Sequence, residues 1–93
     1  MITAIVHIQT DTSLIPETAQ ELAAFPEVET VYSVTGEWDL IAIVRVAEHE
    51  ALADVISDRL SKVQGVAETS TNIAFRTYSD ADLDQAYDLG LGD

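Results

Sequence analysis

Hydrophobic and polar residues change their spacing along this chain, and each change marks a predicted element. Residues 2–9 are β-branched and apolar at both alternate sets of positions, which is typical of a strand covered on two faces. Residues 12–25 place apolar side chains at helical spacing, and Pro16 suits the first helical turn. The pattern predicts a strand and then a helix that ends at Pro26.

A hairpin is the clearest signal in the middle of the chain. Two runs rich in Val and Ile, residues 28–34 and 40–47, flank the polar break Thr-Gly-Glu-Trp-Asp. A loop that only reversed the chain would need neither an indole nor two carboxylates. The predicted loop, residues 35–39, therefore holds groups able to contact a ligand.

The second half of the chain repeats the order helix, breaker, strand. An apolar stripe at helical spacing runs from Leu52 to Val63, Gly65 follows where helices commonly end, and residues 66–78 are predicted to form a fourth strand. The order βαββαβ predicts an α+β, ferredoxin-like sandwich, in which two helices cover one face of a four-stranded antiparallel sheet.

The other face of the predicted sheet carries apolar residues as well. Ile5, Ile41 and Ile43 alternate with the residues that would face the helices. Two helices cover only one face, so these isoleucines would be exposed unless a second subunit buries them. We therefore expect at least a homodimer that forms through this face.

Composition narrows the possible functions. A chain of 93 residues that is 47% hydrophobic allows one domain with a modest core. A formal net charge of −13 would repel a phosphate backbone, so direct binding to nucleic acid is not expected. The absence of cysteine excludes disulfides and thiolate chemistry. With no signal peptide and no apolar run near the ~20 residues of a membrane span, we expect a cytoplasmic protein with no membrane partner.

Three features in this order resemble the effector-binding (RAM) domain of the Lrp/AsnC family of amino-acid-responsive transcriptional regulators. They are Pro26-Glu27-Val28, the hairpin segment 34–40, and Gln64-Gly65-Val66 followed by Thr69-Ser70-Thr71. The resemblance implies a ligand-binding domain over residues 1–78 and leaves residues 79–93 as an acidic C-terminal tail. Full-length members carry a helix-turn-helix domain before this module, whereas this chain begins at the first strand, so we expect a sensor without its own DNA-binding domain.

The resemblance also implies a ligand and an assembly. Such relatives form dimers that assemble into octameric or decameric rings, and they bind small molecules, commonly amino acids, between dimers. A regulatory output would need another chain, such as a full-length Lrp/AsnC regulator, and no cofactor or metal is implied. Carried over by position, the residues that would line the pocket are Thr35, Gly36, Glu37, Trp38 and Asp39 of the loop and Thr69, Ser70 and Thr71 of the last strand.

Most of these residues also have a structural interpretation. Gly36 could serve only to allow a positive φ in the turn. Asp39 could accept a hydrogen bond from a ligand ammonium group or from N–H groups of the loop itself. Trp38 could line the pocket or fill a subunit contact. The hydroxyls of residues 69–71 could bind a carboxylate or simply suit a strand.

Two other features of the sequence are the pair of histidines and the C-terminal tail. His7 and His49 lack the spacing of a metal pair, so we expect ordinary structural or surface roles for both. In the tail, Ser79 and Asp82 have the spacing of a capping box, which favours either a short helix docked on a neighbour or a mobile acidic segment.

Three functions fit the sequence. The first is a non-catalytic sensor of a free amino acid. The second is a small cofactor-free monooxygenase of the dimeric α+β barrel type, which shares the size and topology and could recruit His7, Tyr32, Trp38 and Asn72. The third is a ring-forming protein that binds a protein partner. A specific small ligand would separate the first function from the third.

Overall fold

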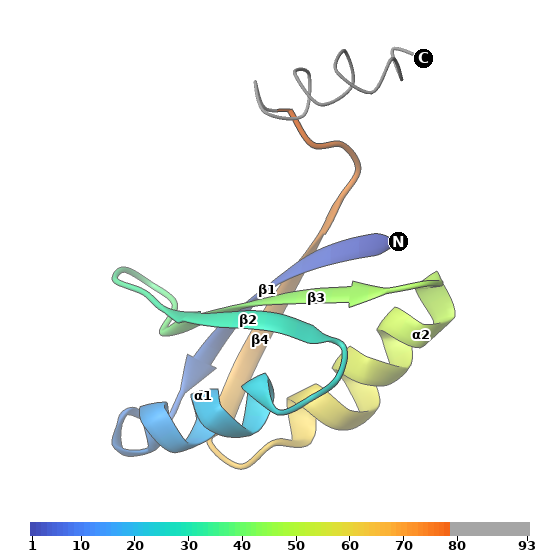
Figure 1. Cartoon of the computed structure of the whole chain (residues 1–93). Coiled ribbons are helices and arrows are strands. Elements are labelled where there is room, and N and C mark those ends of the chain that lie inside the picture. The colour runs from blue at the N-terminus through green and yellow to red at the C-terminus, as the bar shows by residue number, and fades with distance from the viewer. Residues whose placement is uncertain (79–93) are drawn as a thin grey trace, which may run out of the picture.

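The structure of the chain is a computed structural model, and it describes residues 1–78. Four strands form one antiparallel sheet in the order β2-β3-β1-β4, and the helices cover one of its faces (Figure 1). The strands are β1 (Ile2–Thr10), β2 (Val28–Ser33), β3 (Leu40–Val46) and β4 (Val66–Ala74). This is the predicted ferredoxin-like βαββαβ sandwich.

The first helical segment begins with a 3₁₀ turn, η1 (Thr12–Leu14), and continues as α1 (Ile15–Ala23). The Asp11 carboxylate accepts a hydrogen bond from the Ser13 N–H at 3.0 Å and so caps the turn. Hydrogen bonds from the Ser13 N–H and hydroxyl hold the pKa of Asp11 below its usual value. Pro16 lies in the first turn of α1, as predicted.

The second helical segment changes its winding along its length. It begins as α2 (His49–Ala53), widens into a π-helical turn, η2 (Asp54–Arg59), and tightens into η3 (Leu60–Lys62). At the turn that follows, Gly65 has a φ of +97° and lies close to Thr18 of α1. A glycine is needed at that position both for its conformation and for its small size.

The last strand is shorter than the sequence predicted. It ends at Ala74, which pairs with Thr3, and residues 75–78 leave the sheet. The reason is geometric, because β1 begins at Ile2, one residue before Thr3, and a strand that continued to Tyr78 would have no partner over most of that length. The short helix considered for residues 79–93 lies outside the described residues.

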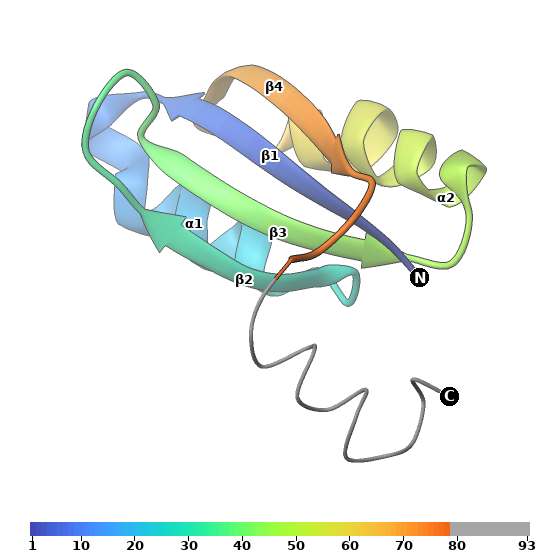
Figure 2. The ribbon, with the colours of Figure 1, turned by 90° about the horizontal axis from the view of Figure 1, so that it is seen from above.

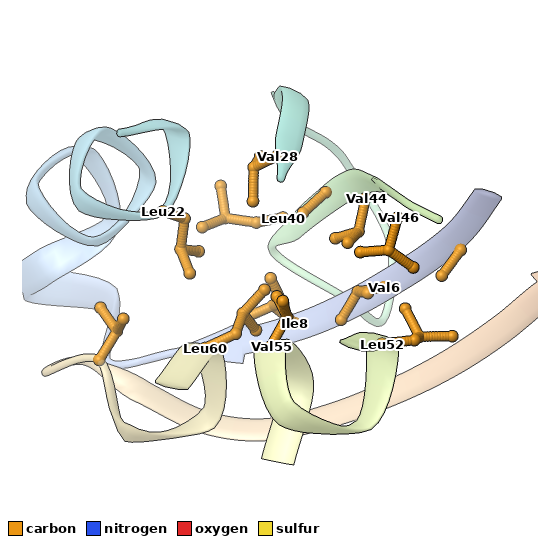
Figure 3. Close-up of a cluster of buried hydrophobic side chains, with 13 residues drawn as sticks. Val6, Ile8, Leu22, Val28, Leu40, Val44, Val46, Leu52, Val55 and Leu60 are labelled. Atoms are coloured by element: carbon orange, nitrogen blue, oxygen red, sulfur yellow. The ribbon is translucent and has the colours of Figure 1, made fainter. Parts of the chain in front are cut away.

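The core lies between the sheet and the helices (Figure 3). Alternate residues of β1 and β3 point into it, and side chains of the two helical segments meet them from the other side. The most enclosed large side chains are Val6, Ile8, Leu22, Leu40, Val44 and Leu60. The hydrophobic effect over this one face is therefore the main stabilising contribution.

The opposite face, which we call the open face, has no helix over it (Figure 2). Ile5, Ile41 and Ile43 lie on this face and are only half-buried. Tyr32 of β2 pairs with Ile41, shares this face and is 55% exposed. We call the three isoleucines the isoleucine patch, and its presence confirms the second apolar set that the sequence indicated. None of the helices within residues 1–78 is long and apolar enough to span a membrane.

Candidate functional site

The loop between β2 and β3 is closed by backbone contacts and has a glycine near its tip. The Val34 N–H donates to the carbonyl oxygen of Asp39 at 3.0 Å. Gly36 has a φ of +107°, which confirms that the turn uses the left-handed conformation open to glycine. A Cβ atom added to Gly36 would meet no atom within 4 Å. Space beside the loop backbone is therefore open to a ligand.

Asp39 fastens the loop to the end of β1. Its N–H donates to the carbonyl oxygen of Ile8 at 3.0 Å, and its Oδ2 accepts a hydrogen bond from the Thr10 N–H at 2.9 Å. Thr10 is buried, so a lost partner there would be costly. Of the two interpretations of Asp39, the geometry supports a structural one, although its partner is a strand and not the loop itself.

Two more residues of β1 hold the same loop. The Gln9 Nε2 donates to the carbonyl oxygen of Glu37 at 3.0 Å. The ring of Trp38 lies against His7, with 5.8 Å between ring centroids and a tilt of 46°. With Asp39 bound to Ile8 and Thr10, each of the last four residues of β1 contacts the loop. The loop is thus presented on a rigid strand.

His7 also reaches β4. Its Nε2 lies 3.0 Å from the Asn72 Oδ1, and with this oxygen as acceptor Nε2 carries the proton. The other ring nitrogen, Nδ1, is shielded from water and has no hydrogen-bond partner among the described residues. The structural role expected for His7 is therefore observed: it supports the indole and bridges β1 to β4. His49 lies exposed at the start of α2, far along the chain from these contacts.

The three hydroxyl residues of β4 do not share one face. Ser70 pairs with His7, so it lies on the open face beside the residue that supports Trp38. Thr69 and Thr71 pair with Ile8 and Val6, whose side chains point toward the helices, so both point to the other side. Only Ser70 of the three faces the same side as the indole.

The loop between β2 and β3 lies near β4, but the two do not pair in the sheet. β1 lies between them, and Ile8 pairs with Leu40 on one side and with Thr69 on the other. Since adjacent strands lie about 4.8 Å apart, roughly 10 Å separate Leu40 from Thr69 across the sheet.

Thr10 and Gln9 are loop-holding residues that the sequence analysis missed. Nothing in their spacing points to the hairpin, because the contacts join residues about 29 positions apart. By contrast, the opposite directions of Thr69 and Ser70 follow from the alternation of any strand. That signal was available in the sequence.

The residues considered for an enzyme also lie on the open face. His7 contacts Trp38 and, separately, Asn72, and Tyr32 shares their face through its pairing with Ile41. Within residues 1–78, no group of three or more His, Asp or Glu side chains is arranged to hold a metal ion. Two hollows of this part of the molecule are lined by other residues than these four, one beside Glu17 and Glu21, the other beside Glu29 and Arg45.

These features describe a small α+β domain that presents a rigid, ligand-accessible loop at one end of an uncovered sheet. The model of the Lrp/AsnC ligand binding domain matches residues 3–83. The chain belongs to this family, which confirms the resemblance drawn from its motifs and identifies it as a ligand-binding domain of the transcription-regulator type.

Individual relatives agree with the assignment. The chain is 38% identical over 61 residues to the HTH-type transcriptional regulator PH1916 of Pyrococcus horikoshii, a match that covers 66% of this chain and 41% of that protein. The structure of TTHA0845 from Thermus thermophilus is 40% identical with a TM-score of 0.80, covering 85% of this chain and 99% of that one. The chain spans about half the length, or less, of the curated relatives it matches.

A related structure contains a ligand. It is the feast or famine regulatory protein Rv3291c from M. tuberculosis, complexed with L-methionine. It is 34% identical to this chain, with a TM-score of 0.67 over 86% of this chain and 54% of that one.

Proposed function

We propose that this chain is a non-catalytic sensor domain that binds a free amino acid and passes on its bound state through subunit contacts. Membership of the Lrp/AsnC ligand-binding family carries the proposal, together with the L-methionine complex of a relative 34% identical to this chain. The proposed site lies beside the hairpin loop, residues 35–39, and β4 residues 69–71. A full-length regulator of the same family is the partner we propose for the output.

The described contacts divide these residues into two groups. Asp39 and Trp38 are engaged by β1, so they shape the loop. Thr35 and Glu37 have exposed side chains with no hydrogen-bond partner within residues 1–78. The Glu37 carboxylate suits a ligand ammonium group, and the Thr35 hydroxyl suits a ligand carboxylate. Gly36 leaves room between them for the ligand backbone.

We further propose that the domain works as a dimer through the open face and that the dimers assemble into octameric or decameric rings. The isoleucine patch supports the dimer, because a monomer would leave three adjacent large apolar side chains partly in water. Family membership supports the ring. Light scattering at micromolar concentration should then report a mass several times 10.1 kDa.

Calorimetric titration with each of the twenty amino acids, including L-methionine, tests the ligand. We expect saturable binding of at least one of them. Glu37→Gln keeps the shape and removes the charge, so it should weaken that binding by about 10- to 100-fold, as for a lost hydrogen bond to a charged group.

Glu48→Gln is the matched control, because Glu48 is an exposed carboxylate just before α2. This variant should bind like the parent protein. Absence of binding across the whole panel would contradict the sensor and favour the ring-forming protein. Equal losses in both variants would show that net charge, and not the loop, governs binding.

A further inference from the structure

Residues 75–78 form a short C-terminal arm that leaves the sheet on the side of the open face. β4 ends at Ala74, opposite Thr3 near the start of β1. From there the arm rises on the side away from α1 and α2 (Figure 1), and seen onto the open face it passes in front of β1 and β3 (Figure 2). The arm is therefore directed over the same face that carries the isoleucine patch.

The arm displays two aromatic rings that its own subunit does not cover. Phe75 is 95% exposed and Tyr78 is 83% exposed. Exposure this high means that neither ring packs on the sheet below it. Large aromatic side chains contribute most when they are buried, so two neighbouring exposed rings mark a contact with another molecule. The patch and the rings are both uncovered, and they do not cover each other within one chain.

Charge on the open face favours a second copy as that molecule. The chain carries 17 acidic residues, so two copies repel each other over most of their surfaces. Along the open face of β1 and β3, however, the side chains are Thr, Ile, His, Gln and Arg, with no carboxylate. The one charged residue on this side of the two strands is Arg45, which pairs with Glu29. On the edge strand β4, Glu68 is opposite Gln9 and adds one carboxylate to the same face. Carboxylates are therefore few over the centre of the open face, and two copies of an acidic chain can approach each other there with little repulsion.

We propose that the arms are exchanged between the two copies of the dimer: Phe75 and Tyr78 of each copy pack on the isoleucine patch of the other. This inference rests on the dimer of the proposed function and adds its contacts. In this dimer the two open faces form the centre of the interface, and each arm lies over the open face of the other copy. The isoleucine patch and the two aromatic rings are then buried together.

Sedimentation over a dilution series tests the contribution of the arm. Phe75→Ala removes one ring from each arm and should raise the dissociation constant of the dimer at least ~10-fold, the lower end for loss of a buried Phe. Ile73→Ala is the matched control. Ile73 lies two residues earlier, is 40% exposed and pairs with Ala4, so it points to the helix side. This variant should dimerise within about twofold of the parent protein.

Disulfide trapping tests where the arm lies. The chain has no cysteine, so two single-cysteine proteins, Phe75→Cys and Ile43→Cys, can be mixed and oxidised. A bond between the two different proteins then arises only between copies. We expect this mixed species, and we expect none when Ile73→Cys replaces Phe75→Cys.

The outcomes separate the arm from the dimer. A parent protein that sediments as a dimer, with equal dissociation constants for Phe75→Ala and Ile73→Ala and no mixed disulfide, would overturn arm exchange and leave the dimer in place. A parent protein that stays monomeric at micromolar concentration would overturn the dimer itself, and arm exchange with it. Amino acid binding by that monomer would show that the sensor proposal is independent of both.

Discussion

The two faces of the sheet have similar sequences and opposite environments. On β1, Val6 and Ile8 are fully buried, whereas their neighbours Ile5 and His7 are only half-buried. The same contrast holds on β3 between Leu40 and Ile41. The side chains are similar in kind, so the difference comes from what lies over each face. Helices cover one face, and within residues 1–78 no element lies over the other.

The largest expected effect distinguishes the faces directly. Leu40→Ala removes a fully buried side chain and should lower the free energy of unfolding by about 2–5 kcal/mol. Ile43→Ala should lower the free energy of unfolding of the dilute protein by less than half as much, because Ile43 already contacts water. Urea denaturation at low protein concentration measures both. Equal losses would mean that the open face is covered within the monomer.

The two left-handed glycines extend the comparison to the turns. An Ala side chain at Gly65 would place its Cβ 2.1 Å from the Oγ1 of Thr18, a residue that is 1% exposed. Gly65→Ala should therefore cost roughly 2–4 kcal/mol, from the strained backbone and the clash together. Gly36→Ala has open space and should cost only about 1 kcal/mol.

Thermal unfolding of the two glycine variants measures this difference. Similar losses would show that backbone strain dominates at both turns and that the contact with Thr18 relaxes easily. If Gly36→Ala loses less stability than Gly65→Ala, the folded Gly36→Ala protein also tests the ligand site. Its new methyl group occupies the space proposed for the ligand, so it should weaken amino acid binding.

Substitution of Asp39, the loop residue that is bonded to β1, should have a smaller effect. Asp39→Asn keeps an acceptor for the Thr10 N–H but removes its charge, so the free energy of unfolding should fall by about 1 kcal/mol. Affinity for the amino acid should stay nearly unchanged, in contrast to Glu37→Gln. Paired unfolding and titration calorimetry measure both quantities. Weakened binding with unaltered stability would instead make Asp39 a ligand contact.

The smallest expected effect is a dependence on pH. The hydrogen bond from Arg59, with 2.6 Å between its Nη2 and the Glu27 Oε2, lowers the pKa of Glu27 from its usual 4.5. A carboxyl with a lowered folded pKa stabilises the fold above its unfolded pKa, and that stabilisation is lost as the pH falls through the folded value. Glu27→Gln should reduce acid sensitivity below about pH 4.5.

The magnitude should stay under about 1 kcal/mol, since the pair remains partly in water. Glu29→Gln is the control, because the Glu29–Arg45 pair is about half exposed on both sides. Denaturation midpoints of both variants between neutral and acidic pH check the prediction. A larger change in the control would show that exposed pairs contribute more than the partly buried one.

Several parts of this molecule could be predicted from the order of residues. Strand and helical periodicity predicted each element of the fold, and the composition Thr-Gly-Glu-Trp-Asp indicated the hairpin loop. The predicted end of β4 was four residues too late, because residues that favour strands continue past Ala74, whereas pairing stops at Thr3, next to the start of β1. Local preference extends a strand only as far as a partner exists.

The candidate site divides in the same way. Sequence motifs pointed to residues 35–39 and to the family, and the glycine conformation at Gly36 followed from its turn. The anchoring of Asp39 on Thr10 and of Trp38 on His7 joins residues about 30 positions apart, and no local pattern encodes such contacts. Which side of β4 meets the loop likewise depends on how β1 pairs with both neighbours.

The sequence by itself determined the elements, their order, the second apolar set of the sheet and the loop with its chemical groups. These depend on periodicity and turn chemistry, which act over a few residues. The tertiary structure alone decided which loop groups β1 engages, which β4 hydroxyl shares their face, and that the aromatic arm lies uncovered above the open face. These depend on distances between residues far apart in the chain, which only the folded sheet brings together.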